Sequence, residues 1–178
     1  MEINELEISN IVKTIVKEMG LLDDIPDTAL VKYKVAIGSD HGGFESKETL
    51  KAYLIKIGHI VTDVGTNSKE AVDYPDYAKK VAYTVASKEC DYGIMIDGAG
   101  IGSCMACNKV KGIRAAMCYN EKTIINSKQH NGANVLTLGG PLHKPEELCN
   151  LAKLWLETPF EGGRHQKRID KIMEIEKE

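Results

Sequence analysis

The chain has 178 residues, a length that favours one globular domain with a sizeable hydrophobic core. Its hydrophobic content of 43% and charged content of 28% are ordinary for such a domain. A formal net charge of −3 gives no attraction to nucleic acid or to an anionic membrane surface. We expect no membrane span and no secretory leader, because no apolar run approaches roughly 20 residues.

The cysteine content predicts a cytoplasmic protein with free thiols. Five cysteines are an odd number, in a chain too long to need disulfides for its stability. Cys104 and Cys107 form a C-x-x-C pair, which could serve redox or metal chemistry. The pair lies in an apolar helical stretch and has no second pair at zinc-finger spacing, so we favour thiols that face the core.

Residues 1–20 differ from the rest of the chain and predict an amphipathic helix. Apolar residues recur at helical spacing from Ile8 to Met19, and Gly20 is a suitable stop. Residues 21–33 are rich in aspartate and predict a linker. Two interpretations of residues 1–20 stay open: a helix that packs on its own domain, or a docking peptide that lays its apolar stripe into a partner's groove.

The region 34–178 predicts a single domain in which short apolar strands alternate with helices. We expect strands at 35–38, 59–64, 92–97, 113–118 and 133–138, and helices at 44–57, 78–87, 103–109, 120–128, 145–156 and 166–177. Strict alternation of this kind predicts an α/β fold, a Rossmann-like doubly wound sheet of about five parallel strands.

The stretch from Tyr92 to Gly102, Y-G-I-M-I-D-G-A-G-I-G, is the strongest indication of a ligand site. An apolar strand ends in Asp97 and is followed by alternating glycines and then by a helix. In parallel sheets ligands bind beyond the carboxyl ends of strands, where glycines let backbone amides approach a ligand oxygen. A tight turn that needs glycine for its conformation alone is the simpler alternative.

Other polar side chains flank the predicted strands. Asp40 and His41 follow the first strand, and His130 and Asn131 precede the fifth. A lone histidine is more often structural than catalytic, but strand-end loops carry much of the chemistry of α/β proteins. The absence of G-x-G-x-x-G after the first strand disfavours a dinucleotide site.

Motifs spread along the chain, from residue 34 to about residue 175, closely resemble the ribose-5-phosphate isomerase B family, which includes the two subunits of galactose-6-phosphate isomerase. The motifs are S-D-H-G-G-F at 39–44, V-D-Y-P-D-Y-A at 72–78, D-G-A-G-I-G at 97–102, N-K-V-K-G-I-R-A-A at 108–116, H-N-G-A-N-V-L at 130–136 and E-G-G-R-H-Q-K-R at 161–168. The resemblance implies a Rossmann-like domain that forms a homodimer or tetramer, with active sites built from two subunits.

The resemblance also implies the reaction and the roles of the site residues. The reaction would interconvert aldose and ketose phosphates through an enediolate, without a metal or organic cofactor, and ribose 5-phosphate to ribulose 5-phosphate is the expected case. His130 would open the sugar ring and Asn131 would hold the enediolate. By the same resemblance, Asp40 and Tyr74 would contact sugar hydroxyls, and His41, Arg164 and Arg168 would bind the phosphate. The backbone amides of residues 98–102, including those of Gly98, Ala99, Gly100 and Gly102, would form an anion hole. Arginine's planar fork suits phosphate, and Arg164 and Arg168 would share one helix face.

The sequence departs from the family pattern at three places. Many members carry the base as a cysteine at the position of Asp97, and others use a glutamate where this chain has Ser103. We expect Asp97 to act as the base, since a carboxylate at a buried strand end can have a raised pKa. Ala99 replaces a common hydroxyl residue, and Pro141 replaces a common arginine for which His143 or Lys144 could substitute.

Two further hypotheses follow from these features. The chain could instead be a family member with lost or altered chemistry that binds sugar phosphates, or one subunit of a hetero-oligomeric isomerase. Residues 1–20 with their linker resemble the encapsulation peptides that carry enzymes into bacterial microcompartments. That resemblance implies a shell or cargo protein as an additional partner.

Overall fold

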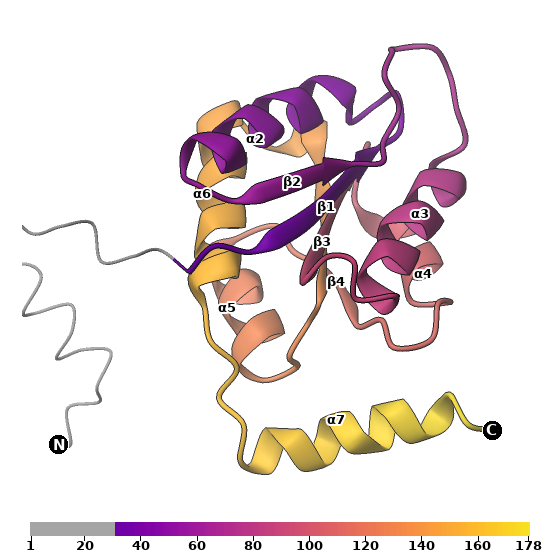
Figure 1. Ribbon diagram of the computed structural model, residues 1–178, viewed down its shortest axis with the longest axis vertical. Coiled ribbons are helices and arrows are strands. Elements are labelled where there is room, and N and C mark those ends of the chain that lie inside the picture. The colour runs from indigo at the N-terminus through magenta and orange to yellow at the C-terminus, as the bar shows by residue number, and fades with distance from the viewer. Residues whose placement is uncertain (1–30) are drawn as a thin grey trace, which may run out of the picture. The chain divides into compact units, whose positions relative to one another are not determined.

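The computed structural model describes residues 31–178, which form a five-stranded parallel sheet with helices on both faces (Figure 1). The strands are β1 (Lys34–Ser39), β2 (Ile60–Asp63), β3 (Tyr92–Asp97), β4 (Ala115–Met117) and β5 (Val135–Gly139). Their spatial order is β2-β1-β3-β5-β4, and every pair is parallel. The predicted Rossmann-like doubly wound fold is confirmed. The predicted helix at 1–20 and nearly all of the linker lie outside the described residues.

The helices divide between the two faces of the sheet. They are α2 (Phe44–Lys56), α3 (Tyr74–Ala86), α4 (Ile101–Cys107), α5 (Glu121–Gln129), α6 (Pro145–Glu157) and α7 (Arg164–Ile175), with a 3-10 turn η1 (Gly140–Leu142) after β5. One core cluster joins α2, α5 and α6 to the sheet, and the other joins α3 and α4 to the opposite face. Strand side chains alternate between them: Ile94 and Ile96 pack in the first and Met95 in the second. Among residues 31–178, no helix is both long and apolar enough to cross a membrane.

Helix α3 begins earlier than the sequence predicts. The sequence predicts a helix from residue 78, whereas α3 starts at Tyr74 with Pro75 in its first turn. Proline is tolerated there because the first turn has no backbone acceptor for the missing N–H. The earlier start places Tyr74 on a rigid helix end instead of in a loop.

The cysteines are free thiols, all five of them within the described residues. Cys107 is fully buried, and burial raises the pKa of its thiol to about 12. Its Sγ points to the backbone oxygen of Ala78 on α3, whereas Cys104 contacts the oxygen of Ala115 on β4. The C-x-x-C pair is therefore a packing feature of α4, with Cys107 held in the thiol form.

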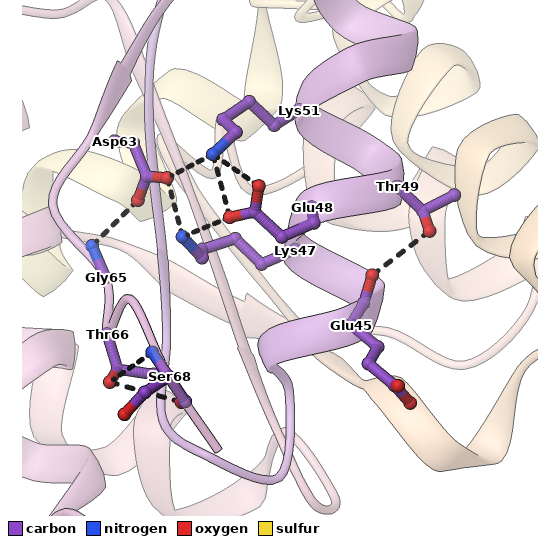
Figure 2. A network of polar contacts seen from close by, with 9 residues as sticks. All are labelled: Glu45, Lys47, Glu48, Thr49, Lys51, Asp63, Gly65, Thr66 and Ser68. Carbon is purple, nitrogen blue, oxygen red and sulfur yellow. Dashed lines mark hydrogen bonds and ion pairs between the residues drawn. The ribbon is translucent and has the colours of Figure 1, made fainter. Parts of the chain in front are cut away.

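A buried lysine ties β2 to α2 (Figure 2). Lys47 is 2% exposed, and its Nζ lies 2.5 Å from Asp63 Oδ2 and 2.8 Å from Glu48 Oε1. Lys51 contacts the same two carboxylates at 2.8 and 2.7 Å, so two cations face two anions. A buried ammonium needs such partners, because an unpaired one would be strongly destabilising.

The same network fixes the end of β1. Asp63 Oδ1 accepts a hydrogen bond of 3.0 Å from the amide of Gly65. A Cβ at Gly65 would lie 2.6 Å from Ser39 N and 2.8 Å from Lys47 Cδ, so the backbone approaches β1 more closely than any side chain allows. Asp40, directly after Ser39, is thereby held at a fixed place beyond the strand.

Candidate active site

Two strand ends and one helix end meet beyond the carboxyl edge of the sheet, and we call their residues Asp40, His41, Tyr74 and 97–102 the carboxyl-end cluster. Asp97 is the last residue of β3 and pairs with Gly139 of β5. A Cβ at Gly42 would lie 3.6 Å from the amide nitrogen of Gly98, so the loops after β1 and β3 touch. These predicted site residues therefore come together.

The tyrosine of this cluster packs directly on the glycine loop. A Cβ at Gly102 would lie 2.6 to 2.8 Å from the ring and hydroxyl of Tyr74. Tyr74 nevertheless keeps 39% of its surface exposed. Glycine at 102 is what lets the phenol lie against the loop while its hydroxyl stays near solvent.

Asp97 is the centre of a hydrogen-bond network inside the loop. Its Oδ1 accepts from the amides of Ala99, at 2.8 Å, and Gly100. Its Oδ2 accepts from the amide of Ser103 at 3.1 Å and from the Ser103 hydroxyl at 2.5 Å. The residue is 5% exposed. Four donors occupy the four acceptor positions of an ionised carboxylate, so Asp97 can receive a proton only if one bond opens.

This network also changes the expected anion hole. The amides of Ala99 and Gly100 point at Asp97, so those two donors are not directed at a ligand. Gly100 has a φ of +79°, and a Cβ there would meet the backbone of β5 at 3.0 Å, which requires glycine. The loop is shaped by its aspartate, and Ser103 is the partner that sequence reasoning did not connect to it.

Asp40 and His41 each contact the backbone of a loop at this end of the sheet. Asp40 is 7% exposed, and its Oδ1 accepts a hydrogen bond of 3.0 Å from the amide of Gly43. His41 is exposed, and its Nδ1 lies 3.2 Å from both the backbone nitrogen and the backbone oxygen of Val72. This contact joins the loop after β1 to the segment that leads into Tyr74.

The remaining predicted residues gather at the other edge of the sheet, and we call His130, Asn131, Glu161, Arg164, His165 and Arg168 the amino-end cluster. His130 is the cap residue that ends α5, and with Asn131 it precedes β5. Arg164 and Arg168 are exposed on the first turns of α7, which confirms that they lie on one helix. Gly162 and Gly163, both with positive φ, turn the chain into α7.

Two histidines stack at the heart of the amino-end cluster. The rings of His130 and His165 are 4.2 Å apart and nearly parallel, at 4°. Glu161 Oε2 lies 3.4 Å from His130 Nε2 and 3.3 Å from His165 Nε2. Burial lowers the pKa of His165, and the neighbouring His130, Arg164 and Arg168 act in the same direction, against the charge of Glu161. Neither Glu161 nor His165 was singled out from the sequence, although both lie in the E-G-G-R-H motif.

Within residues 31–178, the one set of three potential metal ligands close to one another is His130, Glu161 and His165. Imidazole binds a metal through a lone pair in the plane of the ring, and two parallel stacked rings cannot direct lone pairs at one ion. The Arg164 Nε–H also donates to His165 Nε2, at 3.3 Å, and occupies its lone pair. The cluster as it stands does not fit a metal.

The two clusters lie at opposite ends of the strands, because one follows β1 and β3 and the other lies before β5 and on α7. Asp97 pairs with Gly139 at the end of β5, whereas His130 precedes Val135 at its start. From Val135 to Gly139 the strand rises by four steps, or about 13 Å. The fully buried strand residues between them, such as Leu136 and Leu138, are filled core, so one sugar cannot touch both clusters of the same chain.

The structure also shows where the residues near η1 that depart from the family pattern lie. Pro141 is the exposed second residue of η1, and His143 follows it. The His143 side chain is 4% exposed, with Nδ1 3.5 Å from Glu147 Oε1 on α6. Lys144 is exposed at the start of α6 and is therefore the better placed of the two to supply a charge to a ligand.

Comparison with known proteins identifies the family. The family model described as Ribose/Galactose Isomerase matches residues 35–172. The chain is 44% identical over 143 residues to the ribose-5-phosphate isomerase B of Escherichia coli, covering 80% of this chain and 96% of the relative. The chain belongs to the ribose/galactose isomerase family, as the sequence motifs predict.

Solved structures agree with this assignment. A ribose-5-phosphate isomerase B of Clostridium thermocellum is similar with a TM-score of 0.80 and 48% identity, over 81% of this chain and 97% of that one. The Mycoplasma genitalium ribose-5-phosphate isomerase B, whose structure contains bound ribulose 5-phosphate, matches with a TM-score of 0.78 and 43% identity, over 82% of this chain and 97% of that one.

Proposed function

We propose that the protein interconverts an aldose phosphate and a ketose phosphate, with ribose 5-phosphate and ribulose 5-phosphate as the pair. The observation that carries the proposal is the match over residues 35–172, in which the family motifs supply both clusters. Relatives named ribose-5-phosphate isomerase B, at 43 to 48% identity over nearly their full lengths, support the choice of pentose.

In the proposed reaction, His130 opens the sugar ring and Asp97 moves the proton between the two carbons. The base takes the proton from C2 of the open aldose, which leaves an enediolate with its negative charge on O1. The base then returns this proton to C1, and the proton of the C2 hydroxyl moves to O1, which gives the ketose. Asp40 and Tyr74 contact sugar hydroxyls. The amides of the glycine loop that do not serve Asp97 stabilise the negative oxygen.

The phosphate contacts and Asn131 complete the proposal. His41, Arg164 and Arg168 bind the phosphate, for which guanidinium groups are well suited. The Asn131 Nδ2 already donates to Asn126, at 3.2 Å to the backbone oxygen and 3.1 Å to Oδ1. We therefore expect Asn131 to accept from a substrate hydroxyl through Oδ1.

A complete site in this proposal requires two copies of the chain. The carboxyl-end cluster of one copy would face the amino-end cluster of the other, because the core separates the two clusters within one copy. A symmetric dimer makes two such sites from one isologous interface. A homodimer or a tetramer built from such dimers satisfies this requirement.

Ser103 makes the proposed role of Asp97 testable. Of the four donors to Asp97, the hydroxyl of Ser103 is the one that can rotate away without moving the backbone. Asp97→Asn should abolish transfer of deuterium between the substrate's C2 and solvent, whereas Ser103→Ala keeps the carboxylate and should retain turnover. Circular dichroism and the thermal midpoint control for folding. A folded Asp97→Asn variant with unchanged rates would exclude Asp97 as the base.

The four bonds to Asp97 also favour a second candidate function. A carboxylate fully engaged in shaping a loop is suited to a protein that binds sugar phosphate without converting it, or that needs a partner subunit. Calorimetric binding of ribose 5-phosphate without turnover by the purified protein would support this alternative. Turnover by the protein alone would exclude it.

Residues 1–20 are proposed to be an encapsulation peptide for a bacterial microcompartment. The family match begins at residue 35, and the chain covers 96% of the Escherichia coli relative with 80% of its own length, so residues 1–34 precede the family domain. Residues 1–20 fused to a fluorescent protein should form puncta in shell-producing cells. A diffuse signal would count against targeting.

A further inference from the structure

The side-chain amide of Asn126 connects the two predicted catalytic residues of the amino-end cluster. Asn126 Nδ2 lies 2.9 Å from His130 Nδ1, one helical turn along α5. Asn131 Nδ2 contacts both the backbone oxygen and the side-chain Oδ1 of Asn126, at 3.2 and 3.1 Å. Asn126 is exposed, so core packing does not explain its side chain.

The backbone carbonyl of Asn126 determines how the side-chain amides of Asn126 and Asn131 are oriented. The backbone carbonyl of Asn126 can only accept, so the atom of Asn131 that faces it is the donor Nδ2. That donor also meets Asn126 Oδ1, which turns Asn126 Nδ2 toward His130. An amide nitrogen can only donate, so Nδ1 of His130 accepts, and the ring's proton is on Nε2.

The charged neighbours of His130 are compatible with this tautomer. Its Nε2–H faces Glu161 Oε2 at 3.4 Å. Burial lowers the pKa of the stacked His165, so this ring is neutral at neutral pH and adds no charge to the stack. Arg168, in the second turn of α7, is a further cation near His165.

We propose that Asn126 is a positioning residue that holds His130 as the neutral imidazole with its proton on Nε2, and holds Asn131 with its Oδ1 directed outward. A protonated Nδ1 would place N–H against N–H, so Asn126 opposes the imidazolium. A neutral imidazole can still polarise a substrate oxygen by donating from Nε2, as in other sugar-phosphate isomerisations. The tautomer itself does not depend on catalysis. The effect on turnover rests on the proposed function of His130.

The test is Asn126→Asp, which keeps the shape of the side chain and reverses the hydrogen bond to His130. A carboxylate accepts from a protonated Nδ1 and retains the imidazolium to higher pH. Asn150→Asp is the matched control, because Asn150 is exposed on α6 and away from both clusters. The full-length protein is used for every variant.

The first readout is the 15N chemical shift of the two ring nitrogens of His130 at neutral pH. We expect an unprotonated Nδ1 in the unmodified protein and in Asn150→Asp, and a protonated Nδ1 in Asn126→Asp. A proton on Nδ1 in the unmodified protein would overturn the proposal. This readout needs no turnover, so failure of the proposed function cannot be mistaken for failure of the inference.

The second readout is the pH profile of kcat for the isomerisation. If the neutral imidazole is the active form, the acidic limb of the profile should move by about one pH unit toward higher pH in Asn126→Asp. Asn150→Asp should follow the unmodified protein. A profile of Asn126→Asp that superimposes on that of Asn150→Asp, in a folded protein, would refute the positioning role.

Discussion

Mixing two inactive variants tests whether the active site is shared between copies. We choose Asp97→Asn, which damages the carboxyl-end cluster, and His130→Ala, which damages the amino-end cluster. The paired residues Asp97 and Gly139 mark the end of β5, about 13 Å of strand from its start near His130. Since packed core lies between, both defects of a mixed dimer fall in the same shared site, and the other site of that dimer is intact.

The expected recovery can be worked out from this geometry. A mixed dimer has one site with both defects and one site with none. Random exchange makes half of the dimers mixed, and half of their sites are intact, so the mixture should regain about a quarter of the unmodified activity. The assay is ribose 5-phosphate turnover after the variants have been unfolded, mixed and refolded together.

A control pair sharpens the result. Asp97→Asn mixed with Asp40→Asn carries both defects in the carboxyl-end cluster, so every site keeps one defect and activity should stay absent. If Asp97→Asn and His130→Ala also fail to restore activity although mixed dimers form, each chain would contain its own complete site. The account of two separated clusters would then be refuted.

The buried lysines Lys47, which pairs with Asp63, and Lys128 each give a prediction on the pH dependence of stability. Burial opposes the charge of Asp63, but hydrogen bonds from Lys47 and Lys51 outweigh it and hold the pKa of Asp63 below its ordinary value. The stability that the ionised Asp63 contributes is present above its ordinary pKa and is lost as pH falls through its lowered pKa. Asp63→Asn should therefore lower the free energy of unfolding by about 2 kcal/mol at pH 7, measured by urea unfolding. The variant should also lose less stability than the unmodified protein as pH falls below about 4. A variant as stable as the original would contradict the role of the network. Lys128 lies over two aromatic rings at 3.6 and 4.4 Å, and burial lowers its pKa to about 8 from 10.5. The unfolded chain therefore keeps the Lys128 proton between these values, so the contribution of Lys128 to the free energy of unfolding should rise as pH increases from about 8 to 10.5. Measured as the difference in free energy of unfolding between the unmodified protein and Lys128→Met, this contribution cancels the groups that the two proteins share, such as the thiol of Cys107 with its raised pKa. A difference between the two proteins that stays constant from about pH 8 to 10.5 would contradict the lowered pKa of Lys128.

Much of the fold was predictable because hydrophobic periodicity and glycine positions determine the elements of a regular α/β domain. The predicted strand 92–97 coincides with β3, and the positions of Arg164 and Arg168 on one helix were also correct. The start of α3 was missed because Pro75 reads as a loop signal while it also fits a helix's first turn.

The site was harder to predict because it depends on contacts between residues that are far apart in the sequence, or that belong to no recognisable motif. The order of residues already implied that the site residues lie at two ends of the sheet, since Asp97 ends a strand and His130 precedes one. The bond between Asp97 and Ser103 depends on how the glycine loop turns back. Asn126 carries no motif, and its spacing of four from His130 on a predicted helix was the one available signal.

The most direct test of the proposed isomerase activity is the conversion of ribose 5-phosphate to ribulose 5-phosphate by the purified full-length protein, with a chelator present. We expect turnover that the chelator leaves unchanged and that His130→Ala removes. A folded, oligomeric protein that binds ribose 5-phosphate without converting it would contradict the proposed isomerisation.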